Sequence, residues 1–450
     1  MLSNKICPEC NQEFTGFVNR WCEWCNSKNF QSDFDKWTSG NDKIDKFIQD
    51  AQMNADANYK VIEWMPYDRF KDIIEIAKGG FGTIYAAKWI DGPIQKWDAE
   101  NQQWHRYGRC KVALKKFDDN FARLNEDFLN EIAIHLKVGS KSIQIYGITQ
   151  DPETNKYIMV LQYMDGGNLR DYLKNNFNNI NWELKLGFLQ YLTMDFKYIH
   201  ELNIIHQDFH PGNILSWNFK YSSSLQISDF GLSKLIDSDV KVSENRQIFG
   251  VLSYIAPEVL SGEKYTKAAD VYSFGIIAYE IVTGFAPYYD IPHDRDLAIK
   301  ICNGLRPKIP FHIPEFITRL IMKCWDARVT HRPTFNELWN EFFDYHRYYS
   351  KNIFKSNEIT VQIKNAKEYS KNKEKSAFLN LIRRNKSNSE TPTPMNYKTH
   401  PEAIYTSRLL NYSCLPKPNN DKNFESELEE LTKSTSALSM VASELNTPIF

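Results

Sequence analysis

One loop, placed directly after a long helical pattern, constrains this chain more than any other stretch. Residues 206–213 are His-Gln-Asp-Phe-His-Pro-Gly-Asn, with a carboxylate at Asp208 and a carboxamide at Asn213. Sixteen residues beyond Asn213 the sequence continues with Asp229-Phe-Gly. In such an arrangement Asp208 can orient a hydroxyl group while Asn213 and Asp229 hold a metal ion against phosphates. The loop therefore predicts a phosphoryl-transfer site.

Two upstream features could bind the phosphates. The segment Lys-Gly-Gly-Phe-Gly at 78–82 lies between two strand patterns, and a glycine-rich hairpin lets backbone N–H groups approach phosphate oxygens. The strand Val-Ala-Leu-Lys ends at Lys115, and Glu131 follows sixteen residues later in a helical pattern. Lys115 can direct its ammonium at phosphates with Glu131 as the counter-charge. An isolated pair of this kind would instead indicate two solvated side chains.

Taken in order, these motifs resemble those of eukaryotic protein kinases, whose patterns are G-x-G-x-x-G, V-A-I-K, H-R-D-x-x-x-x-N, D-F-G and A-P-E. The resemblance covers roughly residues 68–346, including Ala-Pro-Glu at 256–258. It implies a bilobal α+β kinase fold, with a small β-rich N-lobe carrying one helix and a larger helical C-lobe. It also implies that ATP binds in the cleft between the lobes with Mg²⁺, and that the γ-phosphate passes to protein hydroxyls.

The resemblance also assigns roles to single residues. The implied catalytic set is Asp208, Lys115, Glu131, Asn213 and Asp229. Asn213 and Asp229 would bind Mg²⁺, a hard cation that prefers oxygen ligands. Leu161 would guard the back of the adenine pocket, and the backbones of Gln162 and Met164 would hydrogen-bond adenine. The full implied nucleotide-binding set is Ile76, Gly79, Gly80, Phe81, Gly82, Ile84, Ala113, Lys115, Leu161, Gln162, Met164, Asn213, Leu215 and Asp229.

Four positions depart from the kinase pattern. Ala77 stands at the first glycine of the glycine-rich loop, and Gln207 replaces the arginine before the catalytic aspartate. Val251 and His210 stand where serine/threonine kinases usually have threonine and lysine. Ala77, Gln207 and Val251 favour the alternative of a pseudokinase, the same fold used as a signalling scaffold. All five implied catalytic positions are nevertheless occupied by the expected residues.

Gln207 affects how the activity is expected to be regulated, and three other sequence segments indicate the type of acceptor residue. Gln207 removes the cation that usually receives an activation-segment phosphate. We therefore expect activity to be independent of phosphorylation of the serines between Asp229 and Glu258: Ser233, Ser238, Ser243 and Ser253. The segment 209–213, the Cys-Trp pair at 324–325 and the hinge at 165–167 are most similar to the tyrosine-kinase-like group, which implies Ser/Thr substrates.

Two downstream residues resemble structural elements of kinases. Asp270 begins Asp-Val-Tyr-Ser-Phe-Gly, a segment similar to the helix whose aspartate supports the catalytic-loop backbone. Arg332 in His-Arg-Pro resembles the arginine that pairs with the glutamate of A-P-E, here Glu258. The sequence therefore predicts a buried ion pair between Glu258 and Arg332.

The first thirty residues carry a separate signal. Cys7 and Cys10 form one C-x-x-C hook, and Cys22 and Cys25 form a second one. Four thiolates so arranged can bind one tetrahedral Zn²⁺, and metal binding would then supply the folding energy of so short a segment. The alternative is a disordered leader that happens to carry cysteines. Its aromatic residues could serve a nucleic-acid base, a protein partner or only internal packing.

The remaining segments are assigned more simply. Residues 31–67 form a linker with an amphipathic helix over Asp42–Ala55, and residues 89–110 form a surface insertion without chemistry. Residues 347–450 have the composition of a largely disordered tail. Within the tail, His400–Leu410 is a more structured island that could be a docking peptide, and Phe424–Ala442 could be a short helix.

Bulk composition limits the remaining classes of function. The net charge of −1 gives no general attraction to nucleic acids or to anionic membranes, so a zinc-dependent nucleic-acid binder would rest on residues 1–30 alone. The most apolar run, Phe274–Val282, is too short to span a membrane. We expect a soluble, cytoplasmic protein, with nuclear entry left open, whose eight cysteines are thiols or metal ligands. Its expected partners are protein substrates, and possibly a protein bound by the knuckle or by the tail.

Overall fold

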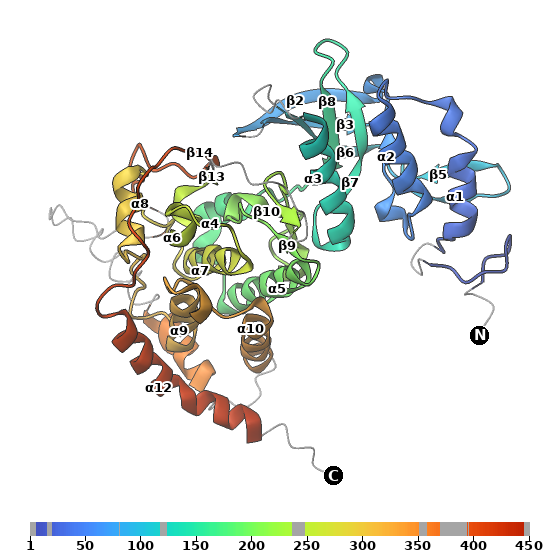
Figure 1. Ribbon diagram of the computed structural model, residues 1–450. Helices are drawn as coiled ribbons and strands as arrows, with labels where there is room; N and C mark the ends of the chain where they lie inside the picture. Colours follow the sequence, from blue (N-terminus) through green and yellow to red (C-terminus); the bar gives the residue numbers. More distant parts are fainter. Residues whose placement is uncertain are drawn as a thin grey trace, which may run out of the picture. The chain divides into compact units, whose positions relative to one another are not determined.

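The computed structural model describes residues 6–15, 20–80, 82–117, 124–235, 248–350, 358–369, 394 and 396–444 (Figure 1). The chain divides into two compact units. The N-terminal unit comprises Met1–Asp165 with Gln226–Gly231, and the C-terminal unit comprises Gly166–Leu225 with Leu232–Phe450. The first unit is built on a β-sheet and the second on helices, so the predicted α+β kinase architecture is confirmed.

A six-stranded sheet in the order β1-β7-β8-β6-β3-β2 forms the N-terminal unit. β1 pairs with β7 in parallel and the other neighbours are antiparallel. Buried residues of its strands, including Trp89, Val112 and Val160, form a hydrophobic core. β-branched and aromatic residues of this kind favour a half-buried sheet. The strands are β1 (Glu63–Trp64), β2 (Phe70–Gly79), β3 (Gly82–Trp89), β6 (Cys110–Phe117), β7 (Ile145–Gln150) and β8 (Tyr157–Gln162).

One helix of this unit, α3 (Leu124–Val138), follows the sheet strand that carries Lys115. Glu131, His135 and Val138 recur at helical spacing and are all buried. The stripe that packs the helix therefore also carries the carboxylate of Glu131 inward.

The insertion and the N-terminal segment pack together. The insertion forms a hairpin of β4 (Ile94–Asp98) and β5 (Gln103–Arg106). Its Trp104 stacks on Phe30, with ring centroids 4.3 Å apart, and on Trp21, at 6.0 Å. Trp21 is buried and donates its indole N–H to the carbonyl of Ala55 at 2.7 Å. The insertion predicted as a surface excursion thus covers the N-terminal segment, and Trp21 serves packing.

The predicted amphipathic helix is present as α2 (Asp42–Met53), preceded by α1 (Glu23–Gln31). Asn41 caps α2 by accepting from the backbone N–H groups of Lys43 and Ile44. Ile44 and Ile48 are fully buried, which confirms the apolar stripe that the sequence predicts.

The helix α7 (Lys267–Thr283) lies at the centre of the C-terminal unit, and every residue from Ala269 to Thr283 is buried. Most residues of the helix are apolar, which suits such a position, and its buried carboxylates Asp270 and Glu280 have hydrogen-bond partners. None of the helices among the described residues is both long and apolar enough to cross a bilayer. The other helices are α4 (Leu169–Asn176), α5 (Trp182–Glu201), α6 (Pro257–Leu260), α8 (Arg295–Cys302), α9 (Glu315–Cys324), α10 (Phe335–Ser350) and α12 (Phe424–Glu444). Short strands are β9 (Ile204–Ile205), β10 (Ile214–Ser216), β11 (Leu225–Ile227), β12 (Lys234–Leu235), β13 (Ile248–Gly250) and β14 (Arg408–Leu410).

The described part of the C-terminal tail is bound to this helical unit, whereas composition alone predicts a largely disordered segment. β14 pairs antiparallel with β13 (Figure 1). Asn420 donates its amide to Asp326 at 2.8 Å and accepts from the backbone N–H of Ala327 at 2.7 Å. The predicted helix is present as α12, which packs on α9. Most of 351–393 lies outside the described residues.

The predicted pair between Glu258 and Arg332 is present and buried. The guanidinium donates two hydrogen bonds to the two carboxylate oxygens, each 2.7 Å long. It also donates to the carbonyls of Asp326 and Ala268. Such a bidentate pair fixes the end of the A-P-E helix α6 to the body of the unit.

Loss of one partner from this pair should destabilise the protein strongly. We expect Arg332→Met to lower the free energy of unfolding by ~3–5 kcal/mol, because Glu258 would remain as an uncompensated buried charge. The exposed pair Lys46–Asp50 provides a control, since Lys46→Met should cost less than about 1 kcal/mol. Urea denaturation measures both variants, and equal losses would contradict the expectation.

Candidate active site

Three of the five implied catalytic residues meet inside the N-terminal unit. The ammonium of Lys115 donates to Glu131 Oε1 at 2.7 Å and to Asp229 Oδ1 at 2.9 Å. Lys115 and Glu131 are almost completely buried. Burial alone would lower the pKa of Lys115, but the carboxylates of Asp229 and Glu131 raise it above its ordinary value. Lys115 is therefore held as a cation at neutral pH.

This arrangement fits the phosphates of a nucleoside triphosphate and a bound metal ion. An ammonium has three N–H groups, and the two described carboxylates take two of them, so a third can donate to a phosphate oxygen. Asp229 brings an oxygen ligand of the kind Mg²⁺ prefers. Its backbone has a positive φ of 62°, and a Cβ on the following Gly231 would come within 3.2 Å of Glu131. The backbone is therefore left-handed at Asp229 and passes close to Glu131 at Gly231.

Phe230 between these two residues is fully buried. Its ring meets His135 of α3 edge to face, with centroids 4.8 Å apart. Phe230 therefore has an apolar packing role, and it fixes the segment carrying Asp229 to the helix carrying Glu131.

The glycine-rich loop forms the tip of the β2–β3 hairpin, where Gly79 pairs with Gly82 and Ala77 pairs with Ile84. Gly82 has a φ of +148°, and a Cβ there would lie 2.2 Å from the carbonyl oxygen of Lys116. A Cβ on Gly79 would meet nothing closer than 4.0 Å. Phe81, another predicted nucleotide contact in this loop, lies outside the described residues. A glycine is thus required at Gly82, because the backbone of β6 passes too close for a side chain. At Gly79 there is open space for a Cβ.

The other predicted nucleotide contacts lie on neighbouring strands. Ala113 on β6 pairs with both Ala86 on β3 and Leu161 on β8. Leu161 and Met164 are buried, and Ile76 is half exposed on the hairpin. Gln162 ends β8, and its backbone N–H donates to Gln144. Ile76, Ala113, Leu161 and Gln162 lie on the sheet that carries Lys115, whereas Met164 follows β8 and Leu215 lies on β10.

The catalytic loop lies in the C-terminal unit. Asp208 is buried, and the amide of Asn213 donates to its backbone carbonyl at 3.0 Å and, more weakly, to its carboxylate at 3.4 Å. These bonds close the loop and orient the amide of Asn213. His206 is fully buried, and its Nδ1 accepts from the backbone N–H of Asp208 at 3.3 Å.

Asp270 supports this loop, as the sequence predicts. Its carboxylate accepts from the backbone N–H groups of His206 and Gln207 at 3.0 and 3.1 Å. It also bonds His200 Nε2 at 2.9 Å. Gln207 has a φ of 68°, an unfavourable conformation for this residue type that the buried carboxylate stabilises.

Sequence reasoning missed two groups beside Asp208. His210 Nε2 lies 3.6 Å from Asp208 Oδ1, so this departure from the kinase pattern places a polar ring where the pattern has lysine. Ser407, from the tail, donates its hydroxyl to Asp208 Oδ2 at 2.5 Å. No kinase motif covers Ser407, and only the less disorder-like composition of 400–410 drew attention to this stretch.

The activation-segment serines divide into two groups. Ser233 and Ser253 are buried, and Ser233 donates its hydroxyl to the carbonyl of His206 at 3.0 Å. Ser238 and Ser243 lie outside the described residues. The expected independence of activity from phosphorylation at these positions therefore stays a prediction.

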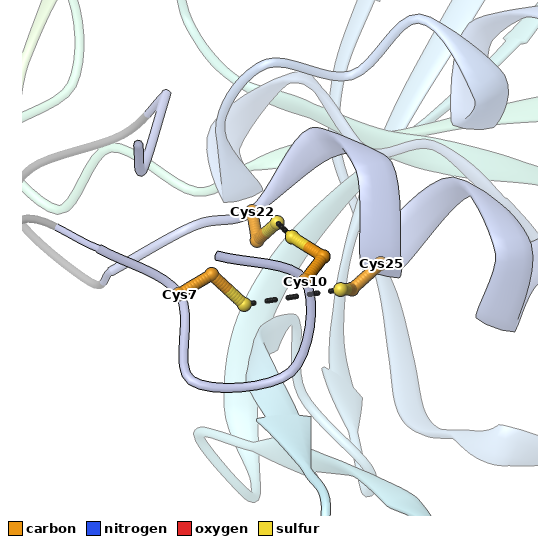
Figure 2. Close-up of side chains that lie close together, drawn as sticks. All are labelled: Cys7, Cys10, Cys22 and Cys25. Atoms are coloured by element: carbon orange, nitrogen blue, oxygen red, sulfur yellow. Dashed lines mark hydrogen bonds between the residues drawn. The ribbon is translucent and has the colours of Figure 1, made fainter. Parts of the chain in front are cut away.

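The four N-terminal cysteines form a cluster, and none is in a disulfide (Figure 2). All four Sγ atoms lie within 4.8 Å of one another, with Cys10–Cys22 at 3.4 Å and Cys7–Cys25 at 3.8 Å. Tetrahedral ligands at a Zn–S distance of about 2.3 Å would be about 3.8 Å apart. The donor set and its spacing therefore fit a zinc ion.

Taken together, fold and site define the class of protein kinases. Residues 70–342 match the family model for protein tyrosine and serine/threonine kinase, and the chain belongs to this family.

Relatives within the family differ in acceptor type. The chain is 30% identical over 302 residues to a serine/threonine-protein kinase/receptor of Acanthamoeba polyphaga mimivirus, a match covering 66% of this chain and 16% of that protein. It is 27% identical to the tyrosine-protein kinase SPK-1 of Girardia tigrina, over 58% of this chain and 50% of the relative. It is 29% identical to the dual specificity protein kinase pyk3 of Dictyostelium discoideum, over 53% and 17%. The chain thus spans a small part of most of these relatives.

The two glycines of the hairpin should respond differently to a methyl group. Gly82→Ala should lower the free energy of unfolding by ~1–3 kcal/mol, because the Cβ meets the backbone of β6 in a strained conformation. Gly79→Ala is the matched control and should change stability by less than about 1 kcal/mol. Chemical denaturation followed by fluorescence measures both, and equal destabilisation would contradict the geometry.

Proposed function

We propose that this chain is an ATP-dependent protein kinase that phosphorylates protein hydroxyls, as the family implies. The observation that carries the proposal is the buried Lys115 bonded to both Glu131 and Asp229. A buried cation between two carboxylates is costly to maintain for structure alone, and it is the arrangement that positions phosphates in this family. ATP supplies the phosphoryl group and Mg²⁺ neutralises its charge.

Each residue then has a defined part. Lys115 binds phosphate oxygens and Glu131 orients the ammonium. Asn213 and Asp229 supply oxygen ligands for Mg²⁺. Asp208 accepts a hydrogen bond from the acceptor hydroxyl and takes its proton.

The acceptor is proposed to be serine or threonine, with the chain in the tyrosine-kinase-like group. The segment 209–213 and the hinge at 165–167 support the group assignment. The serine/threonine kinase among the relatives supports the acceptor type, although tyrosine and dual specificity relatives are also present. The pseudokinase alternative has less support, because every catalytic side chain is present and bonded to its neighbours.

Phosphate transfer tests the proposal directly. Purified protein with Mg-ATP should label a mixed protein substrate, and Asp208→Asn should lower the rate by at least ~100-fold because the general base is removed. Asp290→Asn changes an exposed carboxylate of the same unit and should leave the rate unchanged. Binding of ATP without transfer would support the pseudokinase instead.

We also propose that the four clustered cysteines bind one structural Zn²⁺ and form a knuckle. The short distances between the Sγ atoms support this, as does the position of Cys22 immediately before α1. The knuckle lies in sequence next to Trp21, which packs with Phe30 and Trp104. The ion would therefore stabilise the contact between the N-terminal segment and the insertion hairpin.

Metal analysis tests the zinc proposal. The protein should contain about one Zn²⁺ per chain, and Cys10→Ser should lower the content and raise the exposure of Trp21 and Trp104, seen as a red shift of fluorescence. Cys414→Ser alters an exposed thiol outside the cluster and should leave both unchanged. A full zinc content in the Cys10 variant would contradict the assignment.

A further inference from the structure

The segment 397–410 of the tail lies against the C-terminal unit along its whole length. His400 donates its backbone N–H to the carbonyl of Tyr289 at 2.7 Å. Farther along, His293 donates its backbone N–H to the carbonyl of Glu402 at 3.0 Å, and its ring bonds the carbonyl of Ile404 at 2.9 Å. We call this stretch the docked segment.

Tyr405 is its most extensively bonded side chain. Its hydroxyl donates to the carbonyl of Pro287 at 2.9 Å, and its ring meets that of His293 edge to face. The guanidinium of Arg170 donates to the Tyr405 carbonyl at 2.6 Å and lies 5.0 Å from its ring centroid. An arginine that is mostly covered and used in this way indicates a specific contact.

Two residues later, Ser407 meets the catalytic loop. Its hydroxyl donates to Asp208 Oδ2 at 2.5 Å. His210 Nδ1 accepts from the backbone N–H of Gly212, so in the neutral ring the proton lies on Nε2, which donates to Ser407 Oγ at 3.1 Å. The serine oxygen is thus held by one donor and one acceptor, both from the catalytic loop, as an acceptor hydroxyl would be.

The residues after Ser407 fix its register. Arg408, Leu409 and Leu410 pair antiparallel with Gly250, Phe249 and Ile248 of the activation segment. This ladder begins one residue after Ser407, so the backbone there is held close to the catalytic loop. A side chain as short as serine then reaches Asp208, whereas a tyrosine hydroxyl would extend several bonds beyond it.

Gly250 allows this close approach. It has a φ of +138°, and a Cβ there would lie 3.1 Å from Ile255 and 3.4 Å from Asp208 Oδ1.

Peptide addition to a strand edge, with pockets for alternate side chains, is a general mode of peptide recognition. Leu410 shows the same pattern, since it is 4% exposed while its neighbour Leu409 is 36% exposed.

We propose that the docked segment occupies the protein-substrate site of its own chain and that Ser407 is an intramolecular phosphorylation site. The inference rests on the proposed kinase activity. The unmodified segment excludes other substrates, because a peptide tethered to the enzyme competes with them intramolecularly.

The reaction conserves atoms and charge. The Ser407 oxygen attacks the γ-phosphorus of ATP, a new O–P bond forms, and the bond from the γ-phosphorus to the β–γ bridging oxygen breaks to release ADP. The hydroxyl proton passes to the carboxylate of Asp208, which returns it to solvent. Phosphoserine carries close to two negative charges beside Asp208, and this repulsion releases the segment.

Phosphosite mapping tests the acceptor. Full-length protein, first treated with phosphatase, should incorporate phosphate at Ser407 after addition of Mg-ATP, with a rate constant independent of protein concentration. Thr406→Ala removes the adjacent, exposed hydroxyl and should leave this rate unchanged. A rate that rises with protein concentration would overturn intramolecular transfer, and an unmodified Ser407 in an active enzyme would overturn the acceptor role.

Phosphorylation of an added serine peptide tests the blockade. Wild-type protein should show a lag that ends as Ser407 is modified, and Ser407→Ala should stay at the slow initial rate. Leu410→Asp should be ~10-fold or more faster from the start, because the tethered competitor no longer binds. Leu409→Asp is the matched control and should keep the lag.

Hydrogen exchange without nucleotide tests docking independently of activity. The amides of β13 and β14 should be protected in wild type and in Leu409→Asp, and should exchange faster in Leu410→Asp. Protection that is absent from wild type overturns the inference even if peptides are phosphorylated, in which case the proposed function stands. Failure to phosphorylate any acceptor overturns the proposed function and the acceptor role of Ser407, whatever the exchange shows.

Discussion

The catalytic loop depends on one buried carboxylate. Asp270 accepts two backbone N–H groups from His206 and Gln207 and bonds the ring of His200. An unsatisfied buried carboxylate would be costly, and each of these bonds is charge-assisted. They hold Gln207 in a positive-φ conformation and so fix the backbone that carries the next residue, Asp208. The helix α7 that supplies Asp270 is buried on all sides and cannot move without disturbing the core.

The same principle applies in the N-terminal unit. Lys115 and Glu131 are buried charges, and each would be unfavourable without the other. Asp229 adds a second negative charge to the same ammonium, and it is also a predicted metal ligand. Binding of a divalent cation near Asp229 would redistribute these interactions, because the ion's own charge competes with the ammonium for the carboxylate. The arrangement is therefore stable and still able to respond to a nucleotide.

Much of this site could be predicted from the sequence because its motifs are local and ordered. The strand carrying Lys115, the helix carrying Glu131 and the loop from Asp208 to Asn213 each have a recognisable pattern, and the structure forms each of them. The pair of Glu258 with Arg332 was also predictable by resemblance.

What could not be predicted depends on long-range contacts with no periodic signal. The sequence of the insertion does not predict that Trp104 stacks on Phe30, because neither β4 nor β5 carries a recognisable motif. Ser407 lies 199 residues from Asp208 along the chain, in a tail whose composition indicates disorder. Some of its anchoring bonds are made by single side chains, such as the hydroxyl of Tyr405, and the others are backbone hydrogen bonds, including the β13–β14 ladder. Such contacts are decided by the surface they meet, and local propensity says nothing of that surface.

The departures at Gln207 and His210 acquire a common explanation if the docked segment is a substrate. Gln207 cannot receive an activation-segment phosphate as arginine does, so that route to ordering the segment is lost. β13 of the activation segment is ordered instead by its ladder to β14, and Tyr265 adds a hydrogen bond to the carbonyl of Phe249. His210, in the position of the usual lysine, contacts the acceptor oxygen with a single N–H whose direction is fixed by Gly212. The kinase activity would then be controlled by the state of the Ser407 hydroxyl in the docked segment, in place of a phosphate on the activation segment.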